Sequence, residues 1–289
     1  MARLNVRKTY KLYINGEFPR TESGRFYPVV GKGGELLANA CRGSRKDLRN
    51  AVVAARKAFG GWSGKTAYNR GQILYRIAEV CEARAGELAE ELRQHGSSAA
   101  EARREIEQVV DRWVYYAGWS DKYTQLFGSV NPVAGPYYNF TVPEPTGVVG
   151  IIAPEEPALL GLVSRIAPAI VGGNTAVVVT SEKQPLPAIT LAEAFETSDV
   201  PGGVINLISG LKSELVPWLV SHMDVNAIDV TGVATEAIPA TQKAAAENVK
   251  RVVHFDGAAV GWNDEGRSQS PYAIYDFQES KTVWHPMGM

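Results

Sequence analysis

The sequence predicts an α/β fold built on an open, mostly parallel, doubly wound sheet. From residue 147 onward, five short apolar runs alternate with four segments of helical pattern, which is typical of parallel strands covered on both faces. The runs are 147–153, 175–179, 204–208, 225–230 and 250–255. The first helix between them ends near residue 171, and the other three span about 187–197, 213–221 and 234–247. A content of 45% hydrophobic and 21% charged residues is ordinary for a globular protein.

The first third of the chain predicts short strands and then a layer of three helices. Asn15-Gly16 and the glycine-rich segment 31–34 are turn signals between strands. Ser44 with Asp47 forms a capping box, and we expect that helix to end at Gly60-Gly61. Two further helices are predicted over about 69–93 and 99–123.

Two later segments predict extended structure outside the main sheet. Residues 137–142 have the composition of one strand, and the aromatic tail 271–284 is β-prone. The polar segment 261–270 between the fifth run and the tail predicts a loop. The tail is too short to form a domain of its own.

Charge and cysteine content exclude several classes of protein. Thirty Lys and Arg residues balance 31 Asp and Glu residues, so we expect neither nucleic-acid nor membrane binding. The start of the chain has no apolar core like that of a signal peptide, and polar residues interrupt the apolar stretch 158–179, which we interpret as core. Cys41 and Cys81 cannot form a disulfide framework and suit a reducing compartment, so a cytoplasmic location is expected.

No metal site is predicted, because the four histidines are not spaced as ligand pairs. They are His95, His222, His254 and His285. No GxGxxG motif is present, and a Ser-His-Asp set cannot be argued from spacing.

A series of short segments in chain order carries a family resemblance. They are 13–17 (Tyr-Ile-Asn-Gly-Glu), 47–59, 70–74, 144–154 (Glu-Pro-Thr-Gly-Val-Val-Gly-Ile-Ile-Ala-Pro), 173–175, 181–183, 201–206, 231–232, 248–252 and 279–283 (Glu-Ser-Lys-Thr-Val). The chain resembles an aldehyde dehydrogenase from which the catalytic domain is missing. The resemblance implies one composite domain with three parts: strands and helices over 1–136, a Rossmann-like region over 147–260, and a β oligomerisation element over 137–146 and 271–289.

The catalytic positions of the family are altered. The nucleophilic cysteine belongs to the missing domain, and Cys81 lies on the apolar face of a helix, where cysteine acts as a small hydrophobe. The resemblance places Glu156, beside Glu155, where the family has its oxyanion-binding Asn, and Phe255 where it has its general base. The two acids could stabilise a helix start or form an acid/base pair, and we favour the helix start. His254 or Asp256 could replace the base, but a structural role is favoured because alternation points both away from Phe255.

The cofactor positions are partly altered as well. Glu182 matches a ribose-binding Glu of the family, while Val179 stands where the family has a Lys. Gly232 and Val233 occupy the phosphate-binding turn, from which the hydroxyl is lost, and Glu236 adds negative charge nearby. We therefore expect no resident cofactor, and any NAD binding should be weak.

The resulting functional prediction is a catalytically inactive aldehyde dehydrogenase homologue. It would act as a structural or regulatory subunit, as a homo-oligomer or with a full-length aldehyde dehydrogenase. One alternative is an NAD(P)-dependent aldehyde oxidoreductase whose site is completed by a partner subunit. Another is a free-standing nucleotide-binding module.

Overall fold

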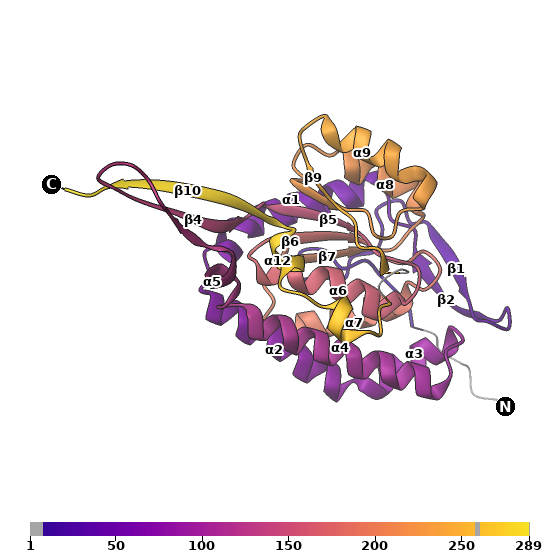
Figure 1. Cartoon of the computed structure of the whole chain (residues 1–289). Coiled ribbons are helices and arrows are strands. Elements are labelled where there is room, and N and C mark those ends of the chain that lie inside the picture. The colour runs from indigo at the N-terminus through magenta and orange to yellow at the C-terminus, as the bar shows by residue number, and fades with distance from the viewer. Residues whose placement is uncertain (1–7, 258–260, 289) are drawn as a thin grey trace, which may run out of the picture.

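A five-stranded parallel sheet forms the centre of the chain (Figure 1). A computed structural model describes residues 8–257 and 261–288. The sheet order is β7-β6-β5-β8-β9, and the strands are β5 (Val148–Ile152), β6 (Thr175–Val179), β7 (Ile205–Ile208), β8 (Ala227–Asp229) and β9 (Arg251–Val253). The order reverses beside β5, as in a doubly wound fold, so the predicted fold class is confirmed. The sequence start, where no signal peptide is expected, and the end of the 147–260 region lie outside the described residues.

Helices cover both faces of this sheet. On one face lie α6 (Ala158–Val171) and α7 (Leu186–Glu196), and on the other lie α1 (Arg45–Ser63), α8 (Lys212–Ser221) and α9 (Ile238–Ala246). Successive strand residues alternate between the two cores: Ile151 packs with the first group and Ile152 with the second. The entire stretch 158–179 is buried, which confirms its interpretation as core. No helix among the described residues is long and apolar enough to cross a membrane.

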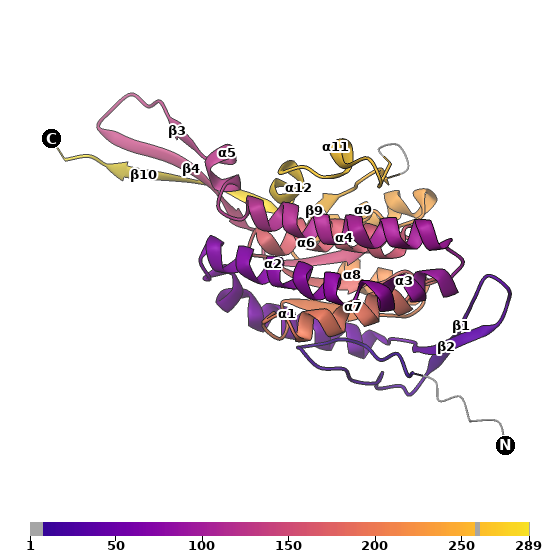
Figure 2. The same cartoon turned by 90° about the horizontal axis from the view of Figure 1, so that it is seen from below.

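Three further N-terminal helices form an outer layer over α6 and α7 (Figure 2). They are α2 (Ala67–Ala83), α3 (Ala85–Gln94) and α4 (Ala99–Trp119), while the short α5 (Tyr123–Phe127) lies beside β4 (Tyr137–Pro145). The single helix predicted over 69–93 is therefore wrong, because Arg84 leaves the helical region with a ψ of 12° and contacts Glu87 and Glu193. The helix predicted over 99–123 likewise ends early, at Trp119.

The capping box of α1 is confirmed, but its predicted end is not. The Ser44 hydroxyl accepts a hydrogen bond from Asp47 N–H, and the Asp47 carboxylate accepts one from Ser44 N–H. The helix continues through Gly60-Gly61 to Ser63. The buried Trp62 stabilises this extra turn, because its indole N–H donates to the Ile170 carbonyl at 2.8 Å.

Short strands precede α1, as predicted. Asn15 and Gly16 both have positive φ, 58° and 77°, and form a tight turn between Ile14 and Glu17. A two-stranded antiparallel ribbon follows, formed by β1 (Phe26–Val30) and β2 (Leu36–Cys41).

A three-stranded antiparallel sheet projects from the body, and we call it the β-arm (Figure 1). Its order is β10-β4-β3, from β3 (Ser129–Asn131), β4 (Tyr137–Pro145) and β10 (Gln278–Pro286). The strand predicted over 137–142 and the C-terminal strand thus pair with each other.

The segment that leads to β10 is more helical than predicted. Instead of a loop over 261–270 and an extended chain from 271, it contains α11 (Glu265–Ser268) and α12 (Tyr272–Tyr275). Tertiary contacts explain the difference. Buried Arg112 donates to the Ser268 carbonyl and hydroxyl oxygens at 3.0 and 2.8 Å, and Ile274 and Phe277 are fully buried.

Candidate functional site

A cavity of about 720 Å³ opens between α8 and α9 at the carboxyl edge of the parallel sheet. Pro154 and Glu155 follow β5 there, and Thr231 and Gly232 follow β8. In open α/β sheets ligands bind at the carboxyl ends of strands where the strand order reverses, which is the β5–β8 boundary in this sheet. The cavity is therefore the candidate ligand site.

The cavity wall is mostly aliphatic, with one cation at its sheet end. The apolar lining residues are Pro154, Val216, Pro217, Val220, Val233, Ala234, Ala237, Ala240 and Ala244. The cation is Lys212, the first residue of α8, which the sequence analysis did not select. A lysine at a helix N-terminus opposes the helix dipole, so it needs compensation from nearby anions.

Two carboxylates provide that compensation. The Lys212 ammonium lies 2.5 Å from the Glu155 carboxylate and donates to the carbonyl oxygens of Ala153 and Gly232 at 2.6 and 3.1 Å. The Lys212 N–H donates to the Glu182 carboxylate at 2.8 Å. This network connects the ends of β5, β6 and β8 to the start of α8. Both the ammonium and the backbone N–H of Lys212 therefore have partners within the chain.

Glu155 is fixed further by the turn after β6. Its carboxylate accepts hydrogen bonds from the Ser181 hydroxyl at 2.7 Å and the Lys183 N–H at 3.0 Å. Burial disfavours its charged form, but the Lys212 ammonium and these donors outweigh burial and hold the pKa of Glu155 below its ordinary value.

We expect Glu155→Gln to destabilise the chain by about 1–2 kcal/mol at pH 7, because it weakens a charged hydrogen-bond network. Since the folded-state pKa is lowered, Glu155 stabilises the fold above its unfolded pKa of about 4.3, and this contribution is lost as the pH falls through the folded value. Urea unfolding of the wild type and the variant from pH 7 to pH 3 measures the difference. The exposed neighbour Glu156→Gln is the matched control and should change stability by less than about 0.5 kcal/mol. A Glu155 effect that persists unchanged at pH 3 would contradict the assignment.

The predicted cofactor positions offer few free polar groups to a dinucleotide. Val179 is fully buried in the core, and the Glu182 carboxylate already accepts from Lys212 N–H. Gly232 N–H donates to the Ile152 carbonyl at 2.8 Å, and a Cβ at Gly232 would lie 1.9 Å from the Ala153 oxygen. The absence of a side chain at Gly232 thus allows its backbone to contact the end of β5, and its own N–H is not free to bind a phosphate. Val233 lines the cavity with an aliphatic side chain.

We accordingly expect NAD and NADP to bind with a dissociation constant no better than about 1 mM, or roughly 4 kcal/mol. The Glu182 carboxylate and the Gly232 N–H, which would hold ribose and phosphate, have partners within the chain, and most of the remaining cavity wall is aliphatic. Isothermal titration calorimetry with both dinucleotides measures the affinity. A dissociation constant well below about 1 mM would show that the Lys212 network opens for the ligand.

Neither acid after β5 stabilises the start of α6. The helix begins at Ala158, and the N–H groups of Leu159 and Leu160 donate to the Glu105 carboxylate of α4 at 3.1 and 3.0 Å. The favoured helix-start interpretation of Glu155 and Glu156 is therefore wrong, and Glu105 performs that role. The acid/base-pair alternative is not supported either, because Glu155 is paired with Lys212 and its neighbour is exposed.

Phe255, at the predicted general-base position, covers a buried ion pair. Arg165 of α6 and Asp229 of β8 are 2% and 0% exposed, and Arg165 Nε lies 2.5 Å from the Asp229 carboxylate. The guanidinium carbon lies 5.3 Å from the centroid of the Phe255 ring and 5.6 Å from that of Phe277, within cation–π distance of both. His254 is exposed while Phe255 is half-buried, in agreement with the alternation argument.

The two thiols lie in the core. Cys81 is fully buried on α2, and burial raises the pKa of its thiol to about 12. A thiol in that state is a poor nucleophile at neutral pH. Cys41, at the end of β2, is also buried. Over residues 8–257 and 261–288, no cluster of three or more His, Cys, Asp or Glu side chains could hold a metal ion.

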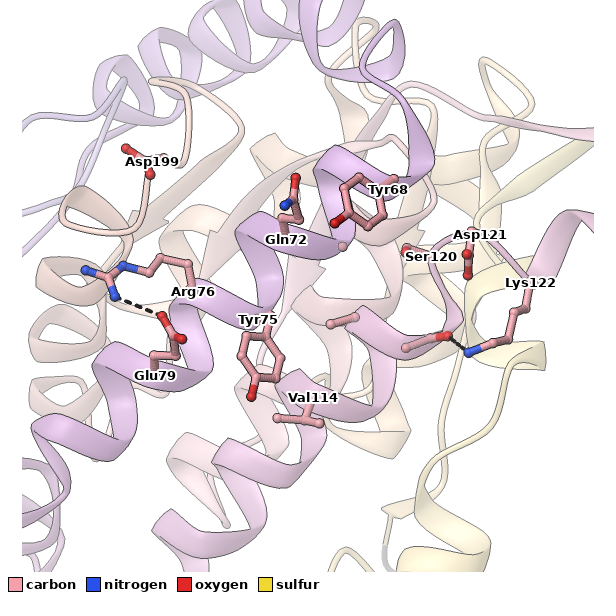
Figure 3. Close-up of a pocket in the computed structure, with 13 residues that line it drawn as sticks. Tyr68, Gln72, Tyr75, Arg76, Glu79, Val114, Ser120, Asp121, Lys122 and Asp199 are labelled. Carbon is pink, nitrogen blue, oxygen red and sulfur yellow. Dashed lines mark hydrogen bonds and ion pairs between the residues drawn. The ribbon is translucent and has the colours of Figure 1, made fainter.

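A second cavity, of about 630 Å³, lies between α2 and α4 on the outer surface (Figure 3). Tyr68 and Tyr75 flank it, and both are more than half exposed. Three of its charged side chains are engaged locally: Arg76 pairs with Glu79 at 2.8 Å, and Lys122 donates to the Gly118 carbonyl. This cavity shares no lining residue with the one at the carboxyl edge of the sheet.

Fold and site together define a doubly wound α/β protein with a ligand cavity at the topological switch point. The sequence model that describes the aldehyde dehydrogenase family matches residues 20–258 of this chain. The chain belongs to the aldehyde dehydrogenase family.

Individual relatives agree with this assignment. Mitochondrial benzaldehyde dehydrogenase of Antirrhinum majus is 35% identical over 247 residues, which cover 84% of this chain and 46% of the relative. Retinal dehydrogenase 2 of Homo sapiens is 35% identical over 252 residues, with 85% and 48% covered. The chain thus spans about half the length of the curated relatives it matches.

Solved structures give the same result. The NAD+ complex of an aldehyde dehydrogenase from Bacillus cereus superposes with a TM-score of 0.81 at 30% identity, over 86% of this chain and 50% of that one. HpcC from Thermus thermophilus gives a TM-score of 0.81 at 33% identity, over 86% and 48%.

Proposed function

We propose that this chain is a catalytically inactive aldehyde dehydrogenase homologue that acts as a structural or regulatory subunit. It would assemble through the β-arm with another family subunit, either a second copy or a full-length aldehyde dehydrogenase. The observation that carries the proposal is the retained arm. Only residues 254–277 separate β9 from β10, yet β10 pairs with β4 along its whole length.

The altered catalytic positions support the inactive part of the proposal. Phe255 packs against a buried ion pair, Glu156 is an exposed acid, and the Cys81 thiol is sealed in the core. A carboxylate cannot donate a hydrogen bond to a developing oxyanion. The near-neutral charge and the buried thiols favour a cytoplasmic location.

The alternative function is an NAD(P)-dependent aldehyde oxidoreductase whose site a partner subunit completes. The retained cavity at the switch point favours it. The engagement of Glu182 and Lys212 within the chain weighs against it, and equally against a free-standing nucleotide-binding module.

We expect removal of residues 279–289 to abolish assembly, because it deletes nearly all of β10. This truncation tests β10 more specifically than a truncation after Ser270, which would also remove the buried Ile274 and Phe277 from the core. Light scattering of the intact and shortened chains, alone and mixed with a full-length aldehyde dehydrogenase, measures the effect. The proposal is wrong if the intact chain stays monomeric in every mixture, or if the shortened chain assembles equally well.

A further inference from the structure

Strand β10 forms one edge of the β-arm and is open along its outer side (Figures 1 and 2). Within residues 8–257 and 261–288, its pairing partner is β4. Residues 279–282 and 284–286 are exposed, and Trp284 is 57% exposed. A long, exposed edge with an accessible aromatic side chain is a template for addition of another strand.

Hydrogen bonds at both ends of the strand identify which residues face outward. Thr146 N–H donates to the Phe277 carbonyl at 3.3 Å, and Met287 N–H donates to the Pro136 carbonyl at 2.8 Å. The register between these bonds is unbroken, and hydrogen-bonded pairs alternate along an antiparallel ladder. The odd-numbered residues of β10 therefore bond to β4, and Ser280, Thr282 and Trp284 direct their N–H and C=O groups outward.

We propose that a second copy of this chain pairs its own β10 with this edge, antiparallel, about a two-fold axis at Thr282. The result is a continuous sheet in which the two β10 strands lie at the centre. This inference rests on the proposed assembly role and names the second copy as the partner. A two-fold contact of this kind is isologous and closed, so it yields a dimer rather than a fibre.

The length of overlap favours this register, and the charge pattern is compatible with it. With Thr282 opposite Thr282 of the second copy, all nine residues of each strand overlap. Glu279 then faces His285 of the second copy, and Lys281 faces Val283, so no like charges lie directly opposite. Opposite-charge pairs across strands are stabilising and like-charge pairs are destabilising.

Neighbouring registers are less favourable. A shift of two residues in either direction shortens the overlap of the two strands, and in one direction it also places Lys281 opposite Lys281 of the second copy. A shift by one residue would place the outward-facing N–H and C=O groups opposite residues whose own N–H and C=O groups bond to β4. The hydrogen bonds between the two β10 strands would then be lost.

A proline at an outward-facing position tests the proposal. Thr282→Pro removes an N–H that points away from β4, so the arm's own ladder is preserved while the outer edge is blocked. Thr282→Val is the matched control, because it also loses the hydroxyl contact with Thr141 but keeps the N–H. Glu279 and Lys281 are left unchanged because they pair with Arg251 and Glu144 within the chain.

In sedimentation equilibrium of the isolated chain, we expect dimers in the wild type and in Thr282→Val. Thr282→Pro should weaken the dimer at least about tenfold, with an unchanged circular dichroism spectrum. A wild-type chain that is monomeric up to about 100 μM, or a Thr282→Pro dimer as tight as that of the wild type, overturns the proposal.

Cross-linking provides a second measurement that does not depend on the proline variant. In the proposed register the two Thr282 Cα atoms lie roughly 5.5 Å apart, within disulfide range. Thr282→Cys should therefore form a covalent dimer on mild oxidation, whereas Ser129→Cys, exposed on the other edge strand, should not. Equal cross-linking of both variants overturns the proposal. A chain that is monomeric alone but binds a full-length aldehyde dehydrogenase overturns the self-pairing and leaves the proposed function standing.

Discussion

The purified chain should not oxidise aldehydes. This expectation follows from the family resemblance, which places the nucleophile outside the matched segments, the exposed Glu156 at the oxyanion position and Phe255 at the position of the general base. Loss of one oxyanion donor alone reduces the rate by about 10²–10³, and under this assignment the chain also has no nucleophile for the covalent route. We therefore expect NADH formation at the buffer background with aliphatic and aromatic aldehydes, measured by absorbance with protein in large excess over a typical assay.

Two variants separate true turnover from contamination. The Cys41→Ala, Cys81→Ala double variant removes both thiols of the chain, and Glu156→Ala removes the altered oxyanion position. Turnover that survives the double variant but disappears in Glu156→Ala would show a different catalytic route in this chain and would favour the oxidoreductase alternative.

Repeating patterns predict the fold well. The five apolar runs each contain one strand of the sheet, and the Ser44 capping box marks the start of α1. The predicted helix boundaries are wrong where contacts with residues distant in the sequence determine the local structure. Gly60-Gly61 indicates a helix end, but the bond from Trp62 to Ile170 continues the helix, and the helical turns after Gly261 depend on contacts with Arg112.

The candidate site is less predictable because its key contacts join separate strands. The family resemblance predicts Val179 and Glu182 as cofactor positions but gives no sign of Lys212, which reaches the Glu182 carboxylate from the start of α8. One local signal was available: a lysine at a helix N-terminus is unfavourable unless anions surround it. Glu105 gave no such signal, since only tertiary packing brings α4 to the start of α6.

The ion pair of Arg165 and Asp229 also joins separate elements and is buried in the core. Both side chains are fully or nearly fully buried, and Asp229 also accepts a hydrogen bond from Thr231 N–H at 2.9 Å. Burial lowers the pKa of a guanidinium, but the Asp229 carboxylate outweighs burial and keeps the pKa of Arg165 raised. The charge of Arg165 thus depends mainly on the Asp229 carboxylate, with a smaller contribution from Asp276.

Asp229→Asn should therefore destabilise the chain by about 3–5 kcal/mol, because it leaves a buried cation without its counter-charge. The amide preserves the shape of the side chain, so the loss reports charge rather than packing. Urea unfolding at pH 7 measures it, and Asp224→Asn, at an exposed position after α8, should change stability by less than about 0.5 kcal/mol. The double variant Arg165→Met, Asp229→Ala should recover most of the loss, since a hydrophobic replacement of a buried pair is often neutral. If Asp229→Asn costs no more than Asp224→Asn, water or another anion compensates Arg165 and the pair does not stabilise the core.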